Sequence, residues 1–351
     1  MVKNILFKIK LKGKGIVNYD SNEQKRILFN YDSKNTNHLR DTNKNVSFAK
    51  KNFFLDKNGI LNYKIKISSD ALRNNIFKED LVAQTSSFIY HPALLYSYIA
   101  SPLGILRGYM FAGKDGKTIK RKSPLTITDA EQISSGKSYI ETFSRSGEKD
   151  IHENKEVSDT SFFKKETIGD IEYQTEGNLN IGDLQFISAD SIFDRVCFNP
   201  NEYEDYYKKF AEVNISDYNG DIGYYTMKTS IVDIPEYGLL LSDKTVKVLI
   251  KEIFKRILKL NIVRTKAYAE LYELNIKLVE NPLIDTFNNK NNWISINSED
   301  DIEQLINNIQ FFKMYEKEDD TKAKEIRQKI EDEYNKKQEL AKKSKLKKSK
   351  K

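Results

Sequence analysis

The chain has 351 residues, enough for one large domain or two modest ones, and its 39% hydrophobic share lies below that of an average globular domain. Seven of its 58 basic residues lie in 341–351, which leaves 51 basic against 51 acidic residues, so residues 1–340 are formally neutral. The net charge of +7 therefore excludes a basic surface spread over the whole protein, and a nucleic-acid interpretation has to rest on local clusters.

The cysteine and histidine content excludes several classes of protein. The single cysteine, Cys197, cannot form an intrachain disulfide and fits a reducing compartment, so we expect a cytoplasmic protein. The three histidines are far apart and match no metal-ligand spacing, so we expect no metal and no other cofactor. The first twelve residues do not resemble a signal peptide, and the most apolar stretch, 88–112, contains prolines and Arg107, so no membrane segment is expected.

The first part of the chain predicts two strands and a helix. Alternating apolar and charged residues predict a strand over 5–11 with one basic face. Residues 20–59 are rich in Asn, Lys, Asp and Ser and predict a long loop or an elaborated hairpin. A second alternating strand covers 61–67, and Ser68 or the serine after it caps a helix that starts near Asp70.

A further helix and a basic strand follow. Residues 102–112 predict a helix in which Gly104 and Gly108 leave room for a close neighbour. After a turn signal at 114–117, the next strand carries the basic cluster 120–122. Residues 158–188 again indicate strands, interrupted by glycines.

The clearest element is a helix over 246–258, whose apolar residues follow helical spacing after a cap at Ser242 or the next residue. It lies between the strand "YGLLL" (237–241) and an alternating strand over 267–279, which predicts a β–α–β unit. A last helix begins at Ser298 with a capping-box pattern. The fold class predicted is α+β, a sheet backed by helices on one face, on a modified RNA-recognition (ferredoxin-like) plan.

Basic clusters recur beside aromatic residues. They lie at Lys64 and Lys66, at 120–122, and in "TSFFKKETIGDIEY" (160–173), where two phenylalanines precede two lysines. Lysine and arginine neutralise phosphates, while aromatic side chains stack on bases or displace them. A solvated face or a core aromatic remains the alternative at each position.

A catalytic interpretation finds less support. No nucleophile with a base, no dinucleotide or Walker glycine motif and no metal set stands out. Asp150 and Asp159 could assist RNA cleavage by general base or metal help, but solvation in a flexible loop is the better explanation. We expect no catalytic residue and no enzyme activity.

Seven segments, in chain order, resemble a known family: "FKIKLKGKGIVN", "ISSDALRNNIF", "GILRGYMF", "KRKSPLTITDAEQ", "TSFFKKETIGDIEY", "LQFIS" and "RTKAY". The family is the backbone subunit of CRISPR Cascade complexes, the Cas-seven family of the RAMP superfamily, and the resemblance is greatest to the type I-F variant. It covers about residues 3–280. Residues 20–59 match poorly and 145–158 look inserted.

The resemblance implies a hand-shaped protein. Residues 1–312 would form a single palm domain with a thumb hairpin inserted around 140–188, and 313–351 would be a charged helical or disordered tail. Copies would line up along the CRISPR RNA (crRNA), each thumb would displace a base, and the spacer would pair with target DNA. The partners implied are crRNA, target DNA, neighbouring copies, and other Cascade subunits, namely an end-capping subunit and a crRNA-processing endonuclease.

The resemblance also assigns RNA contacts residue by residue. The helix after the second strand and the glycine-containing helix would contact the RNA backbone, together with the basic strand and the "RTKAY" turn. One phenylalanine of "TSFFKK" would be the wedge, with both lysines on phosphates. The positions are Arg73, Asn74, Lys78, Arg107, Lys120, Arg121, Lys122, Phe162, Phe163, Lys164, Lys165, Arg264 and Lys266. Two alternatives stay open: a RAMP-type ribonuclease subunit that cuts target RNA, and a stand-alone RNA-recognition protein.

Overall fold

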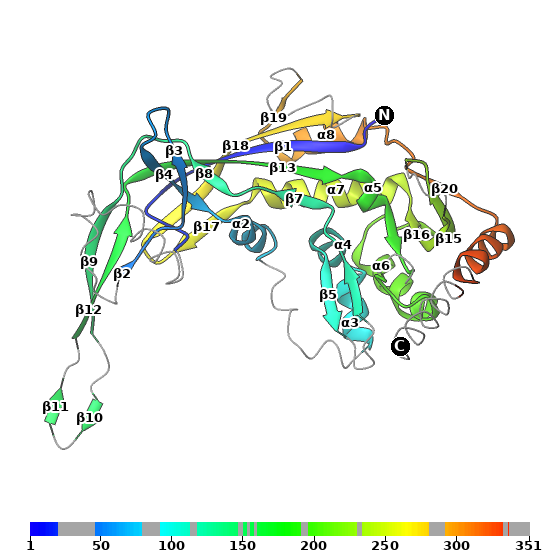
Figure 1. The fold of residues 1–351 in the computed structure, drawn as a ribbon, viewed down its shortest axis with the longest axis horizontal. Helices are drawn as coiled ribbons and strands as arrows, with labels where there is room; N and C mark the ends of the chain where they lie inside the picture. Colours follow the sequence, from blue (N-terminus) through cyan, green and yellow to red (C-terminus); the bar gives the residue numbers. More distant parts are fainter. Residues whose placement is uncertain are drawn as a thin grey trace, which may run out of the picture.

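The computed structural model describes residues 1–19, 46–78, 92–112, 118–146, 150–152, 155–157, 160–190, 196–229, 234–280, 292–332 and 336. Side chains are not described at 46, 92, 143–146, 150–152, 155–157 and 160–163. Within this part of the chain, helices pack on largely antiparallel sheets in a mixed α and β architecture (Figure 1).

The main sheet has nine strands among the described residues, with β13 in the middle of its path and β1 beside it. Its path is β17-β18-β1-β13-β8-β4-β3, with β19 paired to β18 and β7 paired to β13, and every pairing is antiparallel. The strands are β1 (Asn4–Lys14), β3 (Lys51–Leu55), β4 (Leu61–Ile67), β7 (Leu125–Ile127), β8 (Ala130–Gln132), β13 (Asp170–Asn180), β17 (Asn261–Arg264), β18 (Ala267–Val279) and β19 (Ile294–Ile296).

One face of this sheet packs against α7 (Asp243–Leu258), the helix that the apolar spacing predicts. Phe7 on β1 meets Phe254 of α7 edge-on, with ring centroids 5.8 Å apart. Gly177 lies opposite Phe7 in the register, and a Cβ there would lie 2.0 Å from the Phe7 ring. Gly177 therefore continues β13 where the sequence suggested an interruption, because the ring occupies the space of its missing side chain.

The opposite face of the sheet carries the lysines that alternate along β1. Three of them are each paired with a glutamate on a neighbouring strand: Lys8 with Glu176 at 3.4 Å, Lys10 with Glu273 at 2.7 Å, and Lys12 with Glu270 at 3.7 Å. The face predicted to be basic is therefore neutralised by acids on β13 and β18.

A lobe is attached at one end of the sheet. It contains a second sheet of order β14-β16-β15-β20, a two-stranded sheet β5-β6, and several short helices. The strands are β14 (Phe186–Ser188), β15 (Gly220–Met227), β16 (Glu236–Leu241), β20 (Tyr315–Lys317), β5 (Tyr109–Ala112) and β6 (Thr118–Arg121). The helices are α2 (Ser69–Ile76), which precedes the lobe in the chain, then α3 (Pro92–Ile99), α4 (Pro102–Arg107), α5 (Ile181–Gln185), a 3-10 turn (Pro200–Glu202), a π-helical turn (Tyr203–Tyr207) and α6 (Lys208–Asn214).

Two sequence predictions fail in this lobe. The strand "YGLLL" is β16, which pairs with β14 and β15 in the second sheet, so β16, α7 and β18 do not form a β–α–β unit within one sheet. The helix predicted over 102–112 ends at Arg107. Gly108 has φ 76°, and a Cβ there would lie 2.5 Å from the Arg121 carbonyl oxygen, so the chain turns there and continues as β5.

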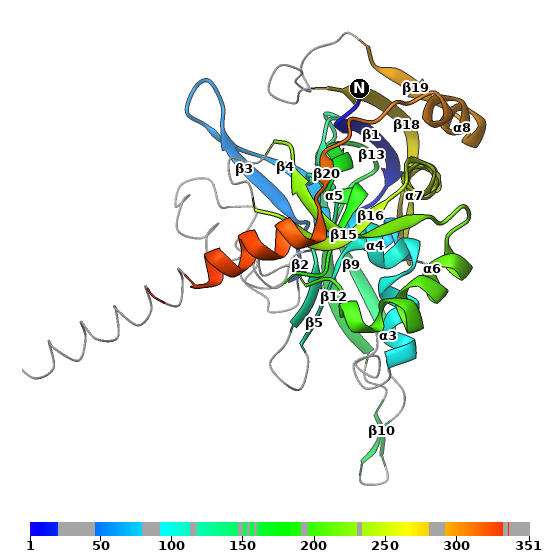
Figure 2. The same cartoon turned by 90° about the vertical axis from the view of Figure 1, so that its right-hand side faces the viewer.

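A long hairpin leaves the other end of the sheet. It is formed by β9 (Tyr139–Ser146) and β12 (Thr160–Thr167), with β2 (Val46–Ser47) parallel to β12 and a short pair, β10 (Asp150–His152) and β11 (Lys155–Val157), beyond it. Figures 1 and 2 show that this hairpin and the lobe helix α3 project from the same side of the main sheet. The predicted insertion 140–188 also contains β13, which is a strand of the main sheet.

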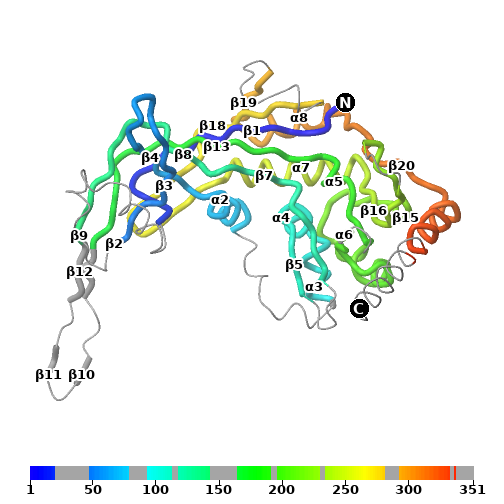
Figure 3. The backbone as a smooth tube through the Cα atoms, viewed as in Figure 1, coloured from blue at the N-terminus to red at the C-terminus, as the bar shows by residue number. Residues whose placement is uncertain are grey.

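The C-terminal region is helical over 320–332 (Figure 3). It follows α8 (Glu299–Asn307), whose capping box at Ser298 is present as the sequence indicates. The first turns of the 320–332 helix contact the lobe, where Ala323 is fully buried and Arg327 contacts both carboxylate oxygens of the buried Asp190, while most of its other residues are exposed. The lysine-rich segment 341–351 lies outside the described residues.

Candidate nucleic-acid interface

The structure brings the predicted site residues into two groups. Arg73, Asn74 and Arg107, which come from two separate sequence motifs, line one pocket. Lys165 and the cations of the "RTKAY" turn line a second pocket. We call these the α2–α4 pocket and the hairpin-base pocket.

Local sequence signals place the side chains of the α2–α4 pocket. Ser68 caps α2 by accepting a hydrogen bond from the Ala71 N–H, and Ser101 caps α4 by accepting one from the Gly104 N–H. Gly104 has no side chain, and a Cβ there would lie 2.3 Å from the Tyr98 carbonyl oxygen, so α4 can lie close to α3. These constraints direct the last residue of α4, Arg107, toward α2.

Arg73 supports the α2–α4 pocket from inside. Its guanidinium donates to the carbonyl oxygens of Leu125 and Arg107, both at 2.7 Å, and to the Ser123 hydroxyl at 3.3 Å. Burial, and next the neighbouring charge of Arg107, lower the pKa of Arg73 from its ordinary value. Arg73 therefore holds the C-terminal end of α4 in place, and its cation adds positive potential behind Arg107.

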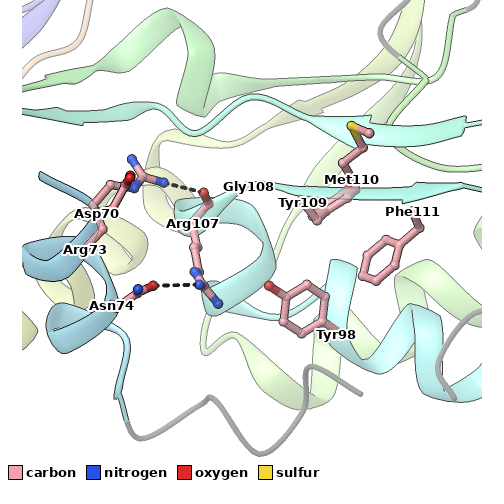
Figure 4. A pocket seen from close by; sticks show the side chains of 9 residues that line it. All are labelled: Asp70, Arg73, Asn74, Tyr98, Arg107, Gly108, Tyr109, Met110 and Phe111. Carbon is pink, nitrogen blue, oxygen red and sulfur yellow. Dashed lines mark hydrogen bonds between the residues drawn. The ribbon is translucent and has the colours of Figure 1, made fainter. Parts of the chain in front are cut away.

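Arg107 and Asn74 face the pocket itself, a cavity of about 570 Å³. Arg107 Nη2 donates to Asn74 Oδ1 at 3.0 Å, and Figure 4 shows the guanidinium between Asn74 and the ring of Tyr98. Arg107 Nη1 is buried and has no hydrogen-bond partner among the described residues. A charged donor without a partner is costly, so an anionic group that bound here and drew the guanidinium toward it would remove that cost.

The basic cluster 120–122, at the end of β6, does not present all three of its side chains to solvent as its sequence suggests. Arg121 is 7% exposed, and its guanidinium donates to the carbonyl oxygens of Ile105, Asp183 and Phe186 at 2.8–3.1 Å. This side chain points into the lobe and cannot also reach a phosphate, so the prediction of an RNA contact by Arg121 is corrected. Lys122 is exposed and Lys120 is half-buried, and both remain candidates, as does the exposed Lys78 just after α2.

The hairpin-base pocket, of about 890 Å³, lies where β9 and β12 join the sheet. Among the described residues that line it, four are cations and one, Glu141, is acidic. The cationic and tyrosine side chains that line it are Lys14, Tyr19, Tyr139, Lys165, Arg264 and Lys266. Arg264 and Lys266 are exposed, Lys165 is half-buried, and the Lys165 ammonium lies 5.5 Å from the centre of the Tyr19 ring.

Three of these residues were not predicted. Lys14 belongs to a motif that carried the family resemblance, and its position between Gly13 and Gly15 was the available signal. Gly15 adopts φ 73°, and a Cβ there would lie 2.9 Å from the Ala267 Cβ, so β1 and the β17–β18 turn meet closely. Nothing in the sequence marks Tyr19 or Tyr139, because only the pairing of distant strands brings them to this pocket.

A hydrogen bond connects the two pockets. Asn18, which lines the hairpin-base pocket, donates through Nδ2 to the hydroxyl of Ser68, the N-cap of α2, at 3.1 Å. Asp70, Arg73 and Asn74 of the other pocket follow two to six residues after Ser68, within roughly 9 Å along the helix axis.

The side chains of Phe162 and Phe163 lie outside the described residues, although their backbones belong to β12, opposite Ser144 and Phe143 of β9. Lys164 is half-buried in the same strand. Of the two candidate cleavage residues, Asp159 lies outside the described residues and only the backbone of Asp150, in β10, is described.

Other kinds of site find no support in the described part of the chain. No group of three His, Cys, Asp or Glu side chains there is placed to hold a metal ion. Cys197 is buried, and burial raises the pKa of its thiol. None of the helices described is long and apolar enough to cross a membrane.

A family model matches most of the chain. The sequence model of a family described as "Type I-Fv CRISPR-associated protein Cas7fv-like" matches residues 1–318. No curated protein matches the chain. Two solved structures described as a "CRISPR RNA-guided surveillance complex", one of them pre-nicking, are 10% identical and cover 80% of this chain and 71% and 77% of theirs, with TM-scores of 0.34 and 0.38. Structural similarity at these TM-scores carries no argument about this chain, so its family is assigned from the match of residues 1–318 to the family model.

Proposed function

Because the chain belongs to the type I-Fv Cas7fv-like family of CRISPR-associated proteins, we propose that it is a crRNA-binding backbone subunit of a Cascade-type interference complex. Copies assemble side by side along the crRNA, grip its backbone and leave the spacer bases able to pair with target DNA. The subunit itself is not catalytic. The observation that carries the proposal, beside the family, is the convergence of Asn74 and Arg107 with the supporting Arg73 in one pocket.

The topology supports an RNA-recognition-like palm. The strands β1, β8, β13 and β18 follow one another in the chain, with α2 between the first two and α7 between the last two. In the sheet they take the order β18-β1-β13-β8, which is the order of a ferredoxin-like fold. The hairpin of β3 and β4 extends this palm at its edge, and the hairpin of β9 and β12 is the thumb.

Phosphates are gripped on the helix side of the palm rather than on its open face. The lysines of that open face are paired with glutamates, so they offer little net charge to a phosphate. The candidate contacts are Asn74, Lys78, Arg107, Lys120, Lys122, Lys164, Lys165, Arg264 and Lys266. Adjacent residues of a strand point to opposite faces, so one of Phe162 and Phe163 displaces a base while the other packs against protein.

The decisive experiment is the identification of nucleic acid that accompanies the purified protein. We expect the full chain, co-expressed with a CRISPR array, to purify as oligomers whose length follows that of the crRNA they carry. Size-exclusion chromatography with sequencing of the bound RNA measures this. A monomer that binds short RNA without forming longer oligomers would instead support a stand-alone RNA-recognition protein.

The rival ribonuclease function makes a different prediction. We expect labelled target RNA to stay intact when it is incubated with the assembled complex, with or without magnesium or manganese. Cleavage that is lost in an Asp115→Ala, Asp150→Ala or Asp159→Ala variant would show that the subunit is an RNA-cutting member of the RAMP superfamily.

A further inference from the structure

We infer that an apolar surface on the β3–β4 hairpin and the adjoining side of β9 docks on the lobe of a neighbouring copy of the chain. We call this surface the apolar corner, and its exposed side chains are Leu55, Ile60, Leu61, Tyr63 and Ile140. The inference rests on the proposed function, because it names the surfaces that join the copies along the RNA.

Most of the apolar corner is one face of the β3–β4 hairpin. Leu55 lies opposite Leu61 in the register and Phe53 lies opposite Tyr63, so these four side chains share one face. Leu55 and Ile60 are both 58% exposed, Tyr63 is 43% exposed and Leu61 is 37% exposed. A group of large apolar side chains exposed together on a soluble protein typically marks a surface that a partner covers.

The apolar corner continues onto β9, on the side away from the hairpin-base pocket. The hydroxyl oxygens of Tyr63 and Ser138 are 3.2 Å apart, and Ile140, two residues after Ser138, is 40% exposed. Tyr139 lines the hairpin-base pocket, and its neighbour Ile140 points to the opposite face of β9. A protein that covered the apolar corner would therefore leave the pocket open to RNA.

Hydrogen bonds fix the tip of the β3–β4 hairpin before any partner binds. One carboxylate oxygen of Asp56 accepts the N–H groups of Asn58 and Ile60, both at 2.9 Å. The other oxygen accepts the side-chain amide of Asn62 at 3.0 Å, and Gly59 closes the turn with φ 74°. A surface that is already ordered loses little conformational freedom on docking, so more of the gain from burying its apolar side chains remains as affinity.

The occupant is a second copy of the chain, because copies that repeat along one RNA need a head-to-tail contact. Such a contact joins two different surfaces of one chain and leaves an open end for the next copy. The lobe offers the second surface: Val213 of α6 is 82% exposed and Leu94 of α3 is 44% exposed. The Asn214 side-chain amide donates to the Ser97 carbonyl oxygen at 3.5 Å, which joins these two helices. The β3–β4 hairpin and α6 lie far apart in both views of the molecule, as a head-to-tail contact requires (Figures 1 and 2).

The test changes each surface separately in the full-length protein assembled on crRNA. Leu55→Ser with Ile60→Ser alters the apolar corner, and Leu94→Ser with Val213→Ser alters the lobe surface. We expect each double variant to weaken the contact between neighbouring copies by roughly 10- to 100-fold, because apolar area is no longer buried there. Native mass spectrometry should then count fewer copies on each crRNA, while the affinity for a short RNA and the melting temperature stay as in the parent.

A mixture of the two double variants tests the head-to-tail arrangement. Each variant keeps one intact surface, so one copy of each should pair through the two intact surfaces. We expect pairs and no longer oligomers from the mixture, at concentrations where each variant alone gives single copies on the RNA. Long oligomers from the mixture would show that the apolar corner and the lobe are not the two halves of one contact and would overturn the inference.

Val263→Ser with Tyr268→Ser is the matched control. These side chains are opposite each other in the β17–β18 register and are 57% and 44% exposed, but they belong to neither surface. We expect this control to form oligomers of the parent length. Parent-length oligomers from both test variants, or short oligomers from the control alone, would overturn the inference and leave the proposed function intact. A parent protein that binds crRNA without forming oligomers would overturn the proposed function as well.

Discussion

Replacing Lys51 with methionine is expected to lower the free energy of unfolding by about 3–5 kcal/mol, because it leaves a buried carboxylate without its counter-ion. Lys51 on β3 and Glu166 on β12 form an ion pair with an N–O distance of 2.7 Å, and their side chains are 8% and 5% exposed. Glu166 also accepts a hydrogen bond from the Ala49 N–H at 2.9 Å. Methionine keeps the length of the lysine chain, so the change removes the charge rather than the packing. Urea unfolding measures the effect.

Two variants separate the lost ion pair from other effects of the substitution. Adding Glu166→Gln to Lys51→Met removes the unpaired charge and should recover most of the lost stability. Lys208→Met breaks an exposed pair with Glu204 and should change the free energy of unfolding far less than Lys51→Met does. If Lys51→Met were no more destabilising than Lys208→Met, the buried pair would not hold the hairpin base together.

This ion pair also links the stability of the fold to the proposed RNA binding. Glu166 directly follows Lys165, a cation of the hairpin-base pocket, and its backbone carbonyl holds Tyr19. Lys51 is in the edge hairpin that extends the sheet. Movement of Glu166 would therefore displace a lysine and a tyrosine of the pocket together, so stability and RNA affinity should fall together in Lys51→Met.

Elements with strong local periodicity could be predicted from the sequence. The strand 61–67, the strand 267–279 and the helix around 246–258 are all present, and Ser68, Ser242 and Ser298 are the helix caps. Each depends on the side-chain pattern of one segment and on a local hydrogen bond, so no tertiary information was needed.

Pairings between distant segments could not be predicted in the same way. The strand before α7 looked like a partner of the strand after it, yet β16 joins a different sheet. Gly108 was recognised as a place of close approach, but its partner, the Arg121 carbonyl, lies thirteen residues later and turns a predicted helix into a strand. These outcomes depend on the pairing of strands that are distant in the sequence, and local residue patterns do not specify that pairing.

The residues of the candidate site also depend on pairings between distant segments, so the sequence predicted them only in part. Family resemblance pointed to Asn74 and Arg107, which lie in one pocket, but composition treated Lys120, Arg121 and Lys122 as one cluster. Pairing of β6 with β5 buries Arg121 and leaves Lys122 exposed. Tyr139 was missed because its role depends on the β17–β18 turn, more than a hundred residues away.

The different burial of these neighbouring cations leads to the second large expected effect. Arg121→Ala is expected to destabilise the protein by roughly 3–5 kcal/mol, because three buried carbonyl oxygens lose a charged donor and each unmet acceptor costs about 1–3 kcal/mol. These carbonyls belong to α4, α5 and β14, so the loss loosens the packing of these elements on β6 within the lobe. Arg121→Lys should restore little, since one ammonium on a flexible chain cannot reproduce the three-way geometry.

Lys122→Ala is the matched control from the next position. It should leave the free energy of unfolding within about 0.5 kcal/mol of the parent, as expected for an exposed side chain. If Lys122 contacts RNA, the same variant weakens RNA binding and reduces the log–log salt slope by about 0.7 on a single strand. Thermal unfolding and salt-dependent RNA binding, measured on all three variants, check both statements. The opposite result would be an Arg121→Ala protein that is as stable as the parent but binds RNA more weakly and with a smaller salt slope. Arg121 would then contact phosphate, and its bonds to the lobe carbonyls would not hold the fold together.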